Sequence, residues 1–538
     1  MEKNRVSVFL IRFLILSGAG FFGCNPHSSE RKTFYVSPAG NDNYEGSITK
    51  PWQTLERANR LVLSPGDTVL FEGGSVFRGT FYLDSVDSGD ETGRVVIGSY
   101  GDGEAIIDGG TKEGIVVTNA GYFKIGDLIV KGAGRKSGNI TNGILISAAD
   151  YFELDNIEVF GFQHSGVLVM GSRNSRLTRI TAHDNGFAGI HVTGKHANDT
   201  LIFDNENLYI GHCVSYNNPG DPTVLSNHSG NGILASSVLG GTMEYCEAFN
   251  NGWDMPWTGN GPVGIWIWDC RNFVIQYCLS HHNMTNLHAG DGGGFDLDGG
   301  VSSSLIQYCI SWSNQGAGIG LFEFGASKPW ENNVVRYNIS RNDGIKNAGS
   351  LSVWKAAGSG IMRNCAVYNN TFINDTSRGY SMSITEHFPG LSFMNNIFVC
   401  KNEFLVPGQG INGESFSGNC FWRMDQSQSF KGTTDFHSWA VGKGKEISDG
   451  RLTGFLEDPM LVNPKAEILP GMSAFGRDSL TAFRLRPDSP LAGRGVDPGS
   501  PYGYENSYTG IDGSEMRHDN VFEIGAAGVL KKQKRQNN

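Results

Sequence analysis

The sequence has little that would suit a protein that binds nucleic acid or an anionic membrane surface. Charged residues make up only 18% of its 538 positions, and the formal net charge is −11. No cluster of Lys or Arg occurs in the body of the chain, before a short basic run from Lys531 to Arg535. Because recognition of a phosphate backbone needs a basic patch, we expect no nucleic-acid partner. An apolar fraction of 39% also excludes wholesale disorder.

Long hydrophobic runs are missing as well. The longest candidate, Phe13 to Phe22, is too short to span a bilayer and follows three basic residues, which is typical of an export signal. It ends at Gly23 and Cys24, a pair that resembles a bacterial lipoprotein signal in which Cys24 is lipidated. We therefore expect residues 1–24 to be a lipoprotein-type signal peptide, although an ordinary export signal is the alternative. The protein would be periplasmic or on the cell surface, with the lipid as its membrane anchor.

No spacing among the Cys and His residues resembles a zinc site. The chain has nine Cys including Cys24, and in an exported protein disulfides must be considered. However, Cys213, Cys246, Cys278 and Cys309 recur at one position of a repeat, beside apolar residues. This recurrence favours a buried ladder of free thiols that behave as small hydrophobic side chains.

The sequence does contain a segment that recurs from about residue 143 to residue 390. Each copy has a short apolar run after a Gly, then an anchor residue, and then an Asn five positions later. Periods of about 30 residues with two or three alternating apolar runs are typical of stacked β coils. The anchors are Cys213, Cys246, Cys278, Cys309, Asn338 and Cys365, and the Asn residues, which we expect to form an amide ladder at a turn, are Asn185, Asn218, Asn251, Asn283, Asn314 and Asn370.

The repeat suggests an N-terminal cap with the first strands over residues 33–110, coils over 111–400, and irregular final coils with a C-terminal closure over 401–538. A short helix is expected within Pro51–Val62. Phrases in the first stretch (FYVSPAGNDNYEGS, PWQTLERA and PGDTVLFEGG) resemble the start of bacterial right-handed parallel β-helix proteins of the pectate-lyase-like superfamily. The resemblance covers roughly residues 33–400 and implies an all-β, right-handed parallel β-helix. It leaves the activity open, because the superfamily holds lyases, hydrolases, esterases and non-catalytic adhesins.

One outward-facing column of side chains changes character in the central coils. Outward positions lie two and four after the repeat Gly, and successive coils stack them at the usual strand spacing of ~4.8 Å. Early coils carry small or aliphatic residues there, whereas the central coils carry Trp, carboxylates and a Lys. These residues, with those at the strand ends, are Trp266, Trp268, Asp269, Asp296, Asp298, Glu323, Trp354, Lys355 and Glu386. The loops 219–231, 251–263 and 284–293 are longer than a bare turn and leave the same corner on successive coils, so they should form one wall beside the column. This wall carries Trp257, His288 and Asp291.

This column favours hydrolysis of a glycan, in which one carboxylic acid protonates the leaving oxygen and a second carboxylate is nucleophile or base. We expect Asp296 or Asp298 to be nucleophile or base and Glu323 to be the acid, with no cofactor required. Crowded carboxyls raise one another's pKa, which suits a general acid. A monomer that binds a poly- or oligosaccharide is expected. Its sugar contacts would be Trp266, Trp268, Trp354, Trp257, His288 and Glu386.

Elimination on a uronate is the second hypothesis. The segment DGGGFDLDGG (291–300) is similar to the one that carries calcium ligands in family nine pectate lyases, where a downstream Lys is the base. That resemblance implies Ca²⁺ held by Asp269 and Asp291 together with the two column aspartates, and Lys355 as the base. Lys355 lies two coils beyond Asp296, however, roughly 9–10 Å away by strand spacing. A non-catalytic, glycan-binding surface lipoprotein is the third hypothesis.

Structural roles compete with each of these assignments. Asp296 and Asp298 could be solvated, Glu323 could face turn amides, and Lys355 could be ion-paired. The Trp pair on the strand before Asp269 could lie beneath loop 251–263 as a satellite of the core.

Overall fold

The structure, a computed structural model, describes residues 31–531 apart from 196–201, 327, 359, 361, 386, 389, 408, 426–429, 431–434 and 507. The expected signal segment with Cys24 and the candidate sugar-binding residue Glu386 lie outside the described residues. Within the described part, no helix combines the length and the apolar character needed to cross a membrane.

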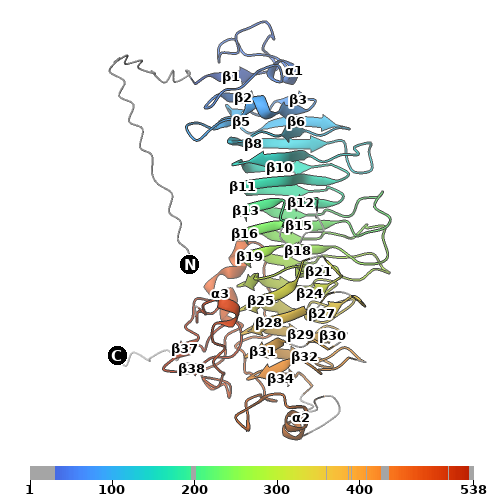
Figure 1. Ribbon diagram of the computed structural model, residues 1–538, viewed down its shortest axis with the longest axis vertical. Helices are drawn as coiled ribbons and strands as arrows, with labels where there is room; N and C mark the ends of the chain where they lie inside the picture. Colours follow the sequence, from blue (N-terminus) through green and yellow to red (C-terminus); the bar gives the residue numbers. More distant parts are fainter. Residues whose placement is uncertain are drawn as a thin grey trace, which may run out of the picture.

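The chain forms a parallel β-helix in which strands stack coil on coil in three columns along the long axis (Figure 1). The all-β fold expected from the repeat is therefore confirmed. The first column holds β4 (Phe81–Leu83), β7 (Ile115–Thr118), β9 (Ile144–Asp150), β12 (Ala188–Thr193), β15 (Asn231–Ser236), β18 (Val263–Trp268), β21 (Gly293–Leu297), β24 (Ile319–Glu323), β27 (Leu351–Lys355) and β30 (Met382–Ile384).

The other two columns complete each coil. The second holds β1 (Thr33–Val36), β2 (Thr68–Glu72), β5 (Val95–Tyr100), β13 (Asn205–Gly211), β16 (Val238–Glu244), β19 (Arg271–Gln276), β22 (Leu305–Gln307), β25 (Trp330–Arg336), β28 (Met362–Tyr368), β31 (Leu391–Met394) and β33 (Ser415–Ser417). The third holds β3 (Val76–Arg78), β6 (Ala105–Gly110), β14 (Val214–Tyr216), β17 (Glu247–Phe249), β20 (Leu279–His281), β23 (Ile310–Trp312), β26 (Ile339–Arg341), β29 (Thr371–Asn374), β32 (Ile397–Cys400) and β34 (Cys420–Arg423). Three long strands turn the corner between columns: β8 (Phe123–Gly132), β10 (Glu153–Phe160) and β11 (Ser165–His183).

The hydrophobic core fills the inside of the coil. Because side chains alternate between the two faces of a strand, the apolar residues one and three positions after the repeat Gly point inward. In β18 and β21, Ile265, Ile267, Phe295 and Leu297 are at most 1% exposed. The eight described Cys are free and buried, which confirms the thiol ladder.

Buried Asn side chains bond from coil to coil along one turn, as the repeat predicts. Asn218 Nδ2 donates to Asn251 Oδ1 at 2.9 Å, and Asn251 Nδ2 donates to Asn283 Oδ1 at 2.9 Å. The ladder continues through Asn314, whose Nδ2 donates to Asp343 Oδ1 at 2.8 Å. These bonds give buried polar groups the partners that they need.

The expected alignment of the last repeat is wrong. Cys365 pairs with Asn333 in the second column and is not the anchor that follows Asn338. Asn338 stacks instead on Asn370, in the turn between the second and third columns, and Asn370 Oδ1 accepts from Asn338 Nδ2 at 2.9 Å. Asn370 therefore belongs to a second amide ladder, because strand register and not residue type sets which positions stack.

Short helices and the C-terminal segment cover the coils. Helix α1 (Leu55–Ala58) and the 3₁₀ turn η1 (Ser85–Asp87) belong to the first coils, and α2 (Phe436–Lys443) lies at the far end of the stack in Figure 1. Later residues fold back along the side of the central and late coils (Figure 1), where Ile468, Leu485 and Ile524 join an apolar cluster with strand residues. A hairpin of β35 (Ile447–Ser448) and β36 (Arg451–Leu452) precedes this fold-back. The fold-back itself contains η2 (Met472–Phe475), α3 (Arg477–Thr481), η3 (Pro501–Gly503) and a second hairpin, β37 (Arg517–His518) with β38 (Val521–Phe522).

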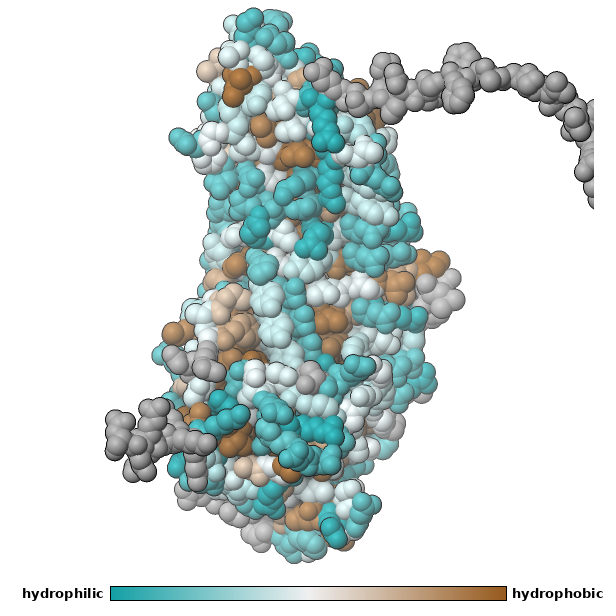
Figure 2. All heavy atoms as spheres, turned by 90° about the vertical axis from the view of Figure 1, so that its left-hand side faces the viewer, coloured by the Kyte–Doolittle hydropathy of each residue, from teal (hydrophilic) through white to brown (hydrophobic). Residues whose placement is uncertain are grey.

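The face that carries this C-terminal cover is mostly hydrophilic or neutral on its surface, with scattered hydrophobic residues (Figure 2). The coil loops that project farthest leave from the opposite side, beside the first column at β12 to β21 (Figure 1).

Candidate functional site

A cavity of about 880 Å³ lies on the outward face of the first column. Its floor comes from β12, β15, β18, β21, β24, β27 and β30. Its wall comes from the loops before β15, β18 and β21, with further residues from the segments before β24 and β27. The strand register places Leu234, Trp266, Asp296 and Gly320 one above another, coil by coil. The outward column that the sequence predicted is therefore the floor of this cavity.

Aromatic rings make up much of the cavity lining. Trp266, Trp268 and Trp354 all line it, together with Phe187 and Phe322. Trp266 is only 4% exposed, and its Nε1 donates to the Asn231 side chain. By contrast, the Trp354 side chain is 40% exposed. One Trp is therefore fixed at the base of the cavity and another is open at its rim. The flat faces of such rings suit the apolar sides of sugar rings.

Three carboxyl groups share the cavity: Asp291, Asp296 and Asp298. Asp296 lies in β21 and Asp298 directly follows that strand, so the strand pleat directs both side chains to the same side. Asp291 precedes β21 in a left-handed turn with φ 50°. Its Oδ2 accepts a hydrogen bond from the Gly261 backbone N–H at 3.0 Å.

Burial sets the acid–base behaviour of these three groups. It raises the pKa of Asp298 to about 8 and the pKa of Asp296 far above its ordinary value, and it also raises the pKa of Asp291. Negative charge on Asp291 and Asp298 raises the pKa of Asp296 further. Like charges in a low-dielectric site cannot all ionise, so the cluster holds protons at neutral pH.

Asp296 is the least satisfied of the three. It is 2% exposed, and its Oδ1 has no hydrogen-bond partner among the described residues. That oxygen lies over Gly320 of the next coil, where an added Cβ would stand 3.1 Å from it. A buried carboxyl oxygen that faces a cavity without a protein partner is an unusual cost, and a ligand hydroxyl or amide could satisfy it.

Glu323, expected to be the general acid, does not reach the cavity. It is 1% exposed, and its Oε1 accepts from the backbone N–H groups of Gly325 at 2.5 Å and Ala326 at 3.0 Å. Its Oε2 accepts from the Gly300 N–H at 3.1 Å. The expected position was wrong because, at the strand end, backbone N–H groups of the adjoining turns bind the carboxylate.

Asp269, expected as a calcium ligand under the lyase hypothesis, also points away from the cavity. Its Oδ2 forms an ion pair with Lys328 Nζ at 2.7 Å, and both side chains are at most 2% exposed. The Lys328 ammonium also lies over the Phe203 ring, 4.8 Å from its centroid. A buried cation thus already neutralises Asp269.

The structure does not fit the calcium site that the resemblance implied. Across the described ranges, no three His, Cys, Asp or Glu side chains gather in a group that could hold a metal ion. Asp291 does line the cavity, but the ion pair to Lys328 removes Asp269 from the proposed ligand set.

Three further candidates lie outside the cavity lining. Lys355 ends β27 beside Glu323 in the strand register. Trp257 donates from Nε1 to Asn260 Oδ1 at 2.8 Å and so shapes the loop, while Asn260 itself lines the cavity. His288 is exposed on its loop. The loops therefore form a wall as expected. The large side chains Trp257 and His288, from which the wall was predicted, are not among the residues that line the cavity.

The sequence pattern missed His228, which lines the cavity from the loop 219–231. This His is 8% exposed, its ring packs edge-on against Trp266, and burial lowers its pKa to about 4. It is therefore neutral at physiological pH. No strand periodicity runs through the loop, so only the loop's extra length, which leaves the same corner as its neighbours, indicated a wall there.

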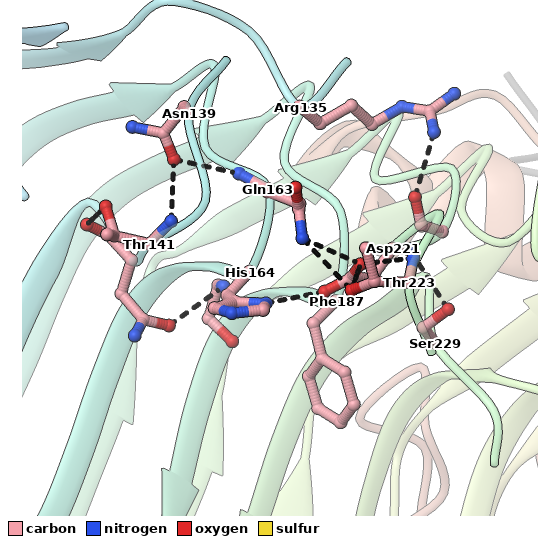
Figure 3. A network of polar contacts seen from close by, with 12 residues as sticks. Arg135, Asn139, Thr141, Gln163, His164, Phe187, Asp221, Thr223 and Ser229 are labelled. Carbon is pink, nitrogen blue, oxygen red and sulfur yellow. Dashed lines mark hydrogen bonds and ion pairs between the residues drawn. The ribbon is translucent and has the colours of Figure 1, made fainter. Parts of the chain in front are cut away.

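A polar network anchors this loop to the coils above it (Figure 3). His164 Nδ1 and Asp221 Oδ2 are 2.5 Å apart, and the Asp221 carboxyl is fully buried. Gln163 Nε2 donates to Thr223 Oγ1 at 3.0 Å, and the Asp221 backbone N–H donates to Ser229 Oγ at 3.0 Å. The loop that brings His228 into the cavity is thus held at its base.

Comparison with known proteins identifies relatives of two activities. A family model described as the Pel9A-like, right-handed beta helix region matches residues 34–347. The match takes in more than half of the chain, and its right-handedness agrees with the fold expected from the sequence.

Two curated proteins are similar to this chain. A lacto-N-biosidase of Bifidobacterium longum subsp. longum is 22% identical over 522 residues, which cover 73% of this chain and 31% of that protein. The chain thus spans about a third of that relative's length. A pectate lyase, PEL9, of Emericella nidulans is 26% identical over 332 residues, which cover 57% of this chain and 74% of that protein. Among solved structures, the complex of XylC with xylose aligns over 93% of this chain and 99% of its own with a TM-score of 0.51 at 11% identity, which bears on the fold alone.

Proposed function

The chain belongs to the Pel9A-like right-handed β-helix family, and on that premise we propose that it is a glycoside hydrolase acting on an uncharged glycan in the first-column cavity. One observation carries the proposal. The cavity gathers three buried carboxyls among aromatic rings, while no Lys or Arg is among its described lining residues. Paired carboxyls, one protonated and one ionised, are the equipment for cleaving a glycosidic bond.

The same observation favours hydrolysis over elimination. A lyase must neutralise the carboxylate of its uronate substrate and supply a base for the C5 proton. Here a uronate would meet three carboxyl groups and no cation within the described lining. Lys355, the base under that hypothesis, does not line the cavity, and Asp269 is occupied by Lys328. The likeness to the Emericella pectate lyase keeps elimination as the second candidate.

We assign the chemistry to Asp291 and Asp298, which flank Asp296 in the sequence and are less fully buried than it is. One of them gives its proton to the leaving oxygen as the glycosidic bond breaks, and the other attacks the anomeric carbon or takes a proton from the attacking water. Asp296, deeper and with the strongly raised pKa, stays protonated and donates a hydrogen bond to a sugar hydroxyl or amide oxygen. This replaces the earlier pairing of Asp296 or Asp298 with Glu323.

The aromatic walls bind the sugar rings. Trp266 and His228, locked together at the base, would support the terminal unit, and Trp354 at the rim would support the next one. Because pockets of about 300–1,000 Å³ hold small ligands, a cavity of this volume would hold a few sugar units. The similarity to a lacto-N-biosidase supports an uncharged oligosaccharide as substrate.

The test uses purified protein with neutral oligosaccharides, among them one ending in a lacto-N-biosyl unit, and with polygalacturonate. We expect reducing sugar to be released from a neutral substrate, undiminished by EDTA. Asp291→Asn and Asp298→Asn should each lower kcat/KM by about 10³-fold or more. Asp102→Asn, on an exposed turn, is the matched control and should change nothing.

The outcomes separate the hypotheses. An aryl glycoside with a good leaving group needs no general acid, so whichever Asp variant regains activity on it has lost the acid. Calcium-dependent ultraviolet absorbance from an unsaturated uronate would instead establish elimination. Binding without turnover of any substrate would reduce the protein to a glycan-binding module.

We further propose that the protein is exported and anchored through a lipid on Cys24. Metabolic labelling with a radioactive fatty acid should mark the wild type and leave Cys24→Ser unlabelled. Equal labelling of both would remove the anchor from the proposal.

A further inference from the structure

The backbone turn that carries Asp298 is held from both neighbouring coils. From the coil before it, Ile267 supplies a carbonyl that accepts the Asp298 backbone N–H at 2.9 Å. From the coil after it, the Glu323 carboxylate accepts the Gly300 N–H at 3.1 Å. The position of the Asp298 carboxyl in the cavity therefore depends on groups that lie outside the cavity.

Glu323 connects this turn to a second one. Its other oxygen accepts the N–H groups of Gly325 and Ala326, so that a single buried carboxylate fixes the segments after β21 and after β24. Three backbone donors would lose their partner if the carboxylate were removed, and the loss matters most at Gly300, the one of the three that is buried. The Glu323 carboxylate thus holds two turns together, and we call this arrangement the clamp; it is not a solvated strand end.

The segment after β24 packs closely against this turn. An added Cβ at Gly299 would stand 2.5 Å from the Phe324 ring, and one at Gly300 would stand 3.0 Å from the Ala326 Cβ. Gly300 also has φ +71°, which disfavours any side chain there. The two glycines let the segment after β24 press directly against the backbone beside Asp298.

We propose that Glu323 is a positioning residue, whose carboxylate clamps the Asp298–Gly300 turn and places a fixed negative charge beside the Asp298 carboxyl without touching the substrate. The inference rests on the proposed function, because it requires Asp298 to take part in the reaction. It gives Glu323 a part in catalysis through Asp298 in place of the direct proton transfer expected from its place in the sequence.

The electrostatics agree with this geometry. Burial is the largest cause that raises the pKa of Asp298 to about 8, and the charges of Asp291 and Glu323 raise it further. Removing the Glu323 charge should therefore lower the pKa of Asp298. The sign does not depend on the role of Asp298: whether it must be protonated or ionised, its limb of the pH profile moves to lower pH.

The experiment compares the pH profile of kcat/KM for the wild type and Glu323→Gln. We expect the limb that Asp298→Asn abolishes to move down by ~0.5–1 pH unit. We also expect kcat to fall about 10- to 100-fold with little change in KM, because a small displacement of a reacting group lowers turnover more than binding.

Glu446→Gln is the matched control. Glu446 is also a fully buried carboxyl that binds backbone and side-chain N–H groups, those of Asn419, but it lies beyond the last coil strands and far along the chain from the cavity. Its substitution should lower stability by a similar amount while the pH limbs and kcat stay in place. A merely structural role for Glu323 predicts the same behaviour as this control.

A second measurement is independent of activity. Thermal unfolding between pH 5 and 9 is followed for the wild type, Glu323→Gln, Asp298→Asn and the double variant. We expect the two substitutions to be coupled only above the pH at which Asp298 ionises, because the repulsion needs both charges. If this coupling appears while no substrate is cleaved, the proposed function fails and the clamp stands. Unmoved pH limbs together with additive stabilities at every pH would overturn the clamp itself.

Discussion

Two buried aspartates on neighbouring coils show how differently this fold treats a carboxyl group. Asp343, 0% exposed, ends the amide ladder and accepts hydrogen bonds from Asn314 and from the hydroxyls of Ser311 and Ser340. Asp296 is as deeply buried but has an oxygen without a described partner, and that oxygen faces the cavity. The Asp343 carboxyl has a structural role and its hydrogen bonds are made within the protein. Asp296 keeps an acceptor site that a ligand in the cavity could fill.

The neighbours of the two aspartates also shift their pKa values in opposite directions. Hydrogen bonds partly offset burial at Asp343, so that its pKa is raised only to about 6. At Asp296, neighbouring carboxyls add to burial and raise the pKa much further. A site that concentrates like charges at a cost in stability is typical of function, because selection for the fold alone would remove it.

The largest expected effects come from truncating each aspartate. Asp343→Ala should lower the free energy of unfolding by ~3 kcal/mol or more, because several buried donors lose their acceptor. Asp296→Ala should leave stability unchanged or raise it, yet lower kcat/KM by about 100-fold, the usual cost of one preorganised polar contact. Denaturant unfolding and initial rates measure both; equal losses of stability in the two variants would erase the distinction.

A smaller effect concerns the pH dependence of stability. The folded-state pKa of Asp298, about 8, lies above that of an unfolded Asp, ~3.9. The folded state therefore binds the proton more tightly, and this contribution is fully present below ~pH 4 and lost as the pH rises through about 8. Between pH 5 and 8, the melting temperature of Asp298→Asn should fall less than that of the wild type.

Asp343 sharpens this prediction as an internal control. Its pKa of about 6 confines its own contribution to the window between ~pH 4 and 6. Asp343→Asn should therefore flatten the pH dependence only in that lower window. If the melting temperatures of the wild type and Asp298→Asn fall in parallel as the pH rises above 6, the cavity carboxyls are not protonated as inferred.

The repeat pattern predicted the amide ladder up to Asn314 and the floor of the cavity for the same reason. Strand alternation and coil register fix which side chains face outward, so Trp266, Asp296 and Trp354 could be placed from the sequence alone. Their position, and not their chemistry, was predictable. Cys365 was misplaced because matching residue types took precedence over strand register.

Prediction failed at the strand ends and in the loops. Glu323 and Asp269 stand where strands give way to turns, and there the local backbone N–H groups and a distant Lys328 decide the direction of the side chain. Those partners come from segments with no period, so no spacing marked them. His228 was missed for the same reason, since it reaches the cavity from a loop whose path depends on the anchoring network.

The smallest expected effect comes from that network and compares two ion pairs of the cavity wall. His164 with the fully buried Asp221 holds the loop 219–231, whereas Asp254, with its side chain 36% exposed, ties the next loop to Arg135. Asp254 is more exposed than Asp221, so solvent screens its ion pairs with Arg135 and Lys136 more strongly. Asp254→Asn should therefore change KM less than Asp221→Asn, which should raise KM a few-fold at constant kcat. The hydrogen bond to Asp221 raises the pKa of His164, so the anchor is complete at acid pH and weakens as the pH rises through the raised pKa of this His. The wild-type KM should accordingly rise toward alkaline pH and the Asp221→Asn KM should not; equal pH dependence in both would mean that this pair does not set the position of the wall.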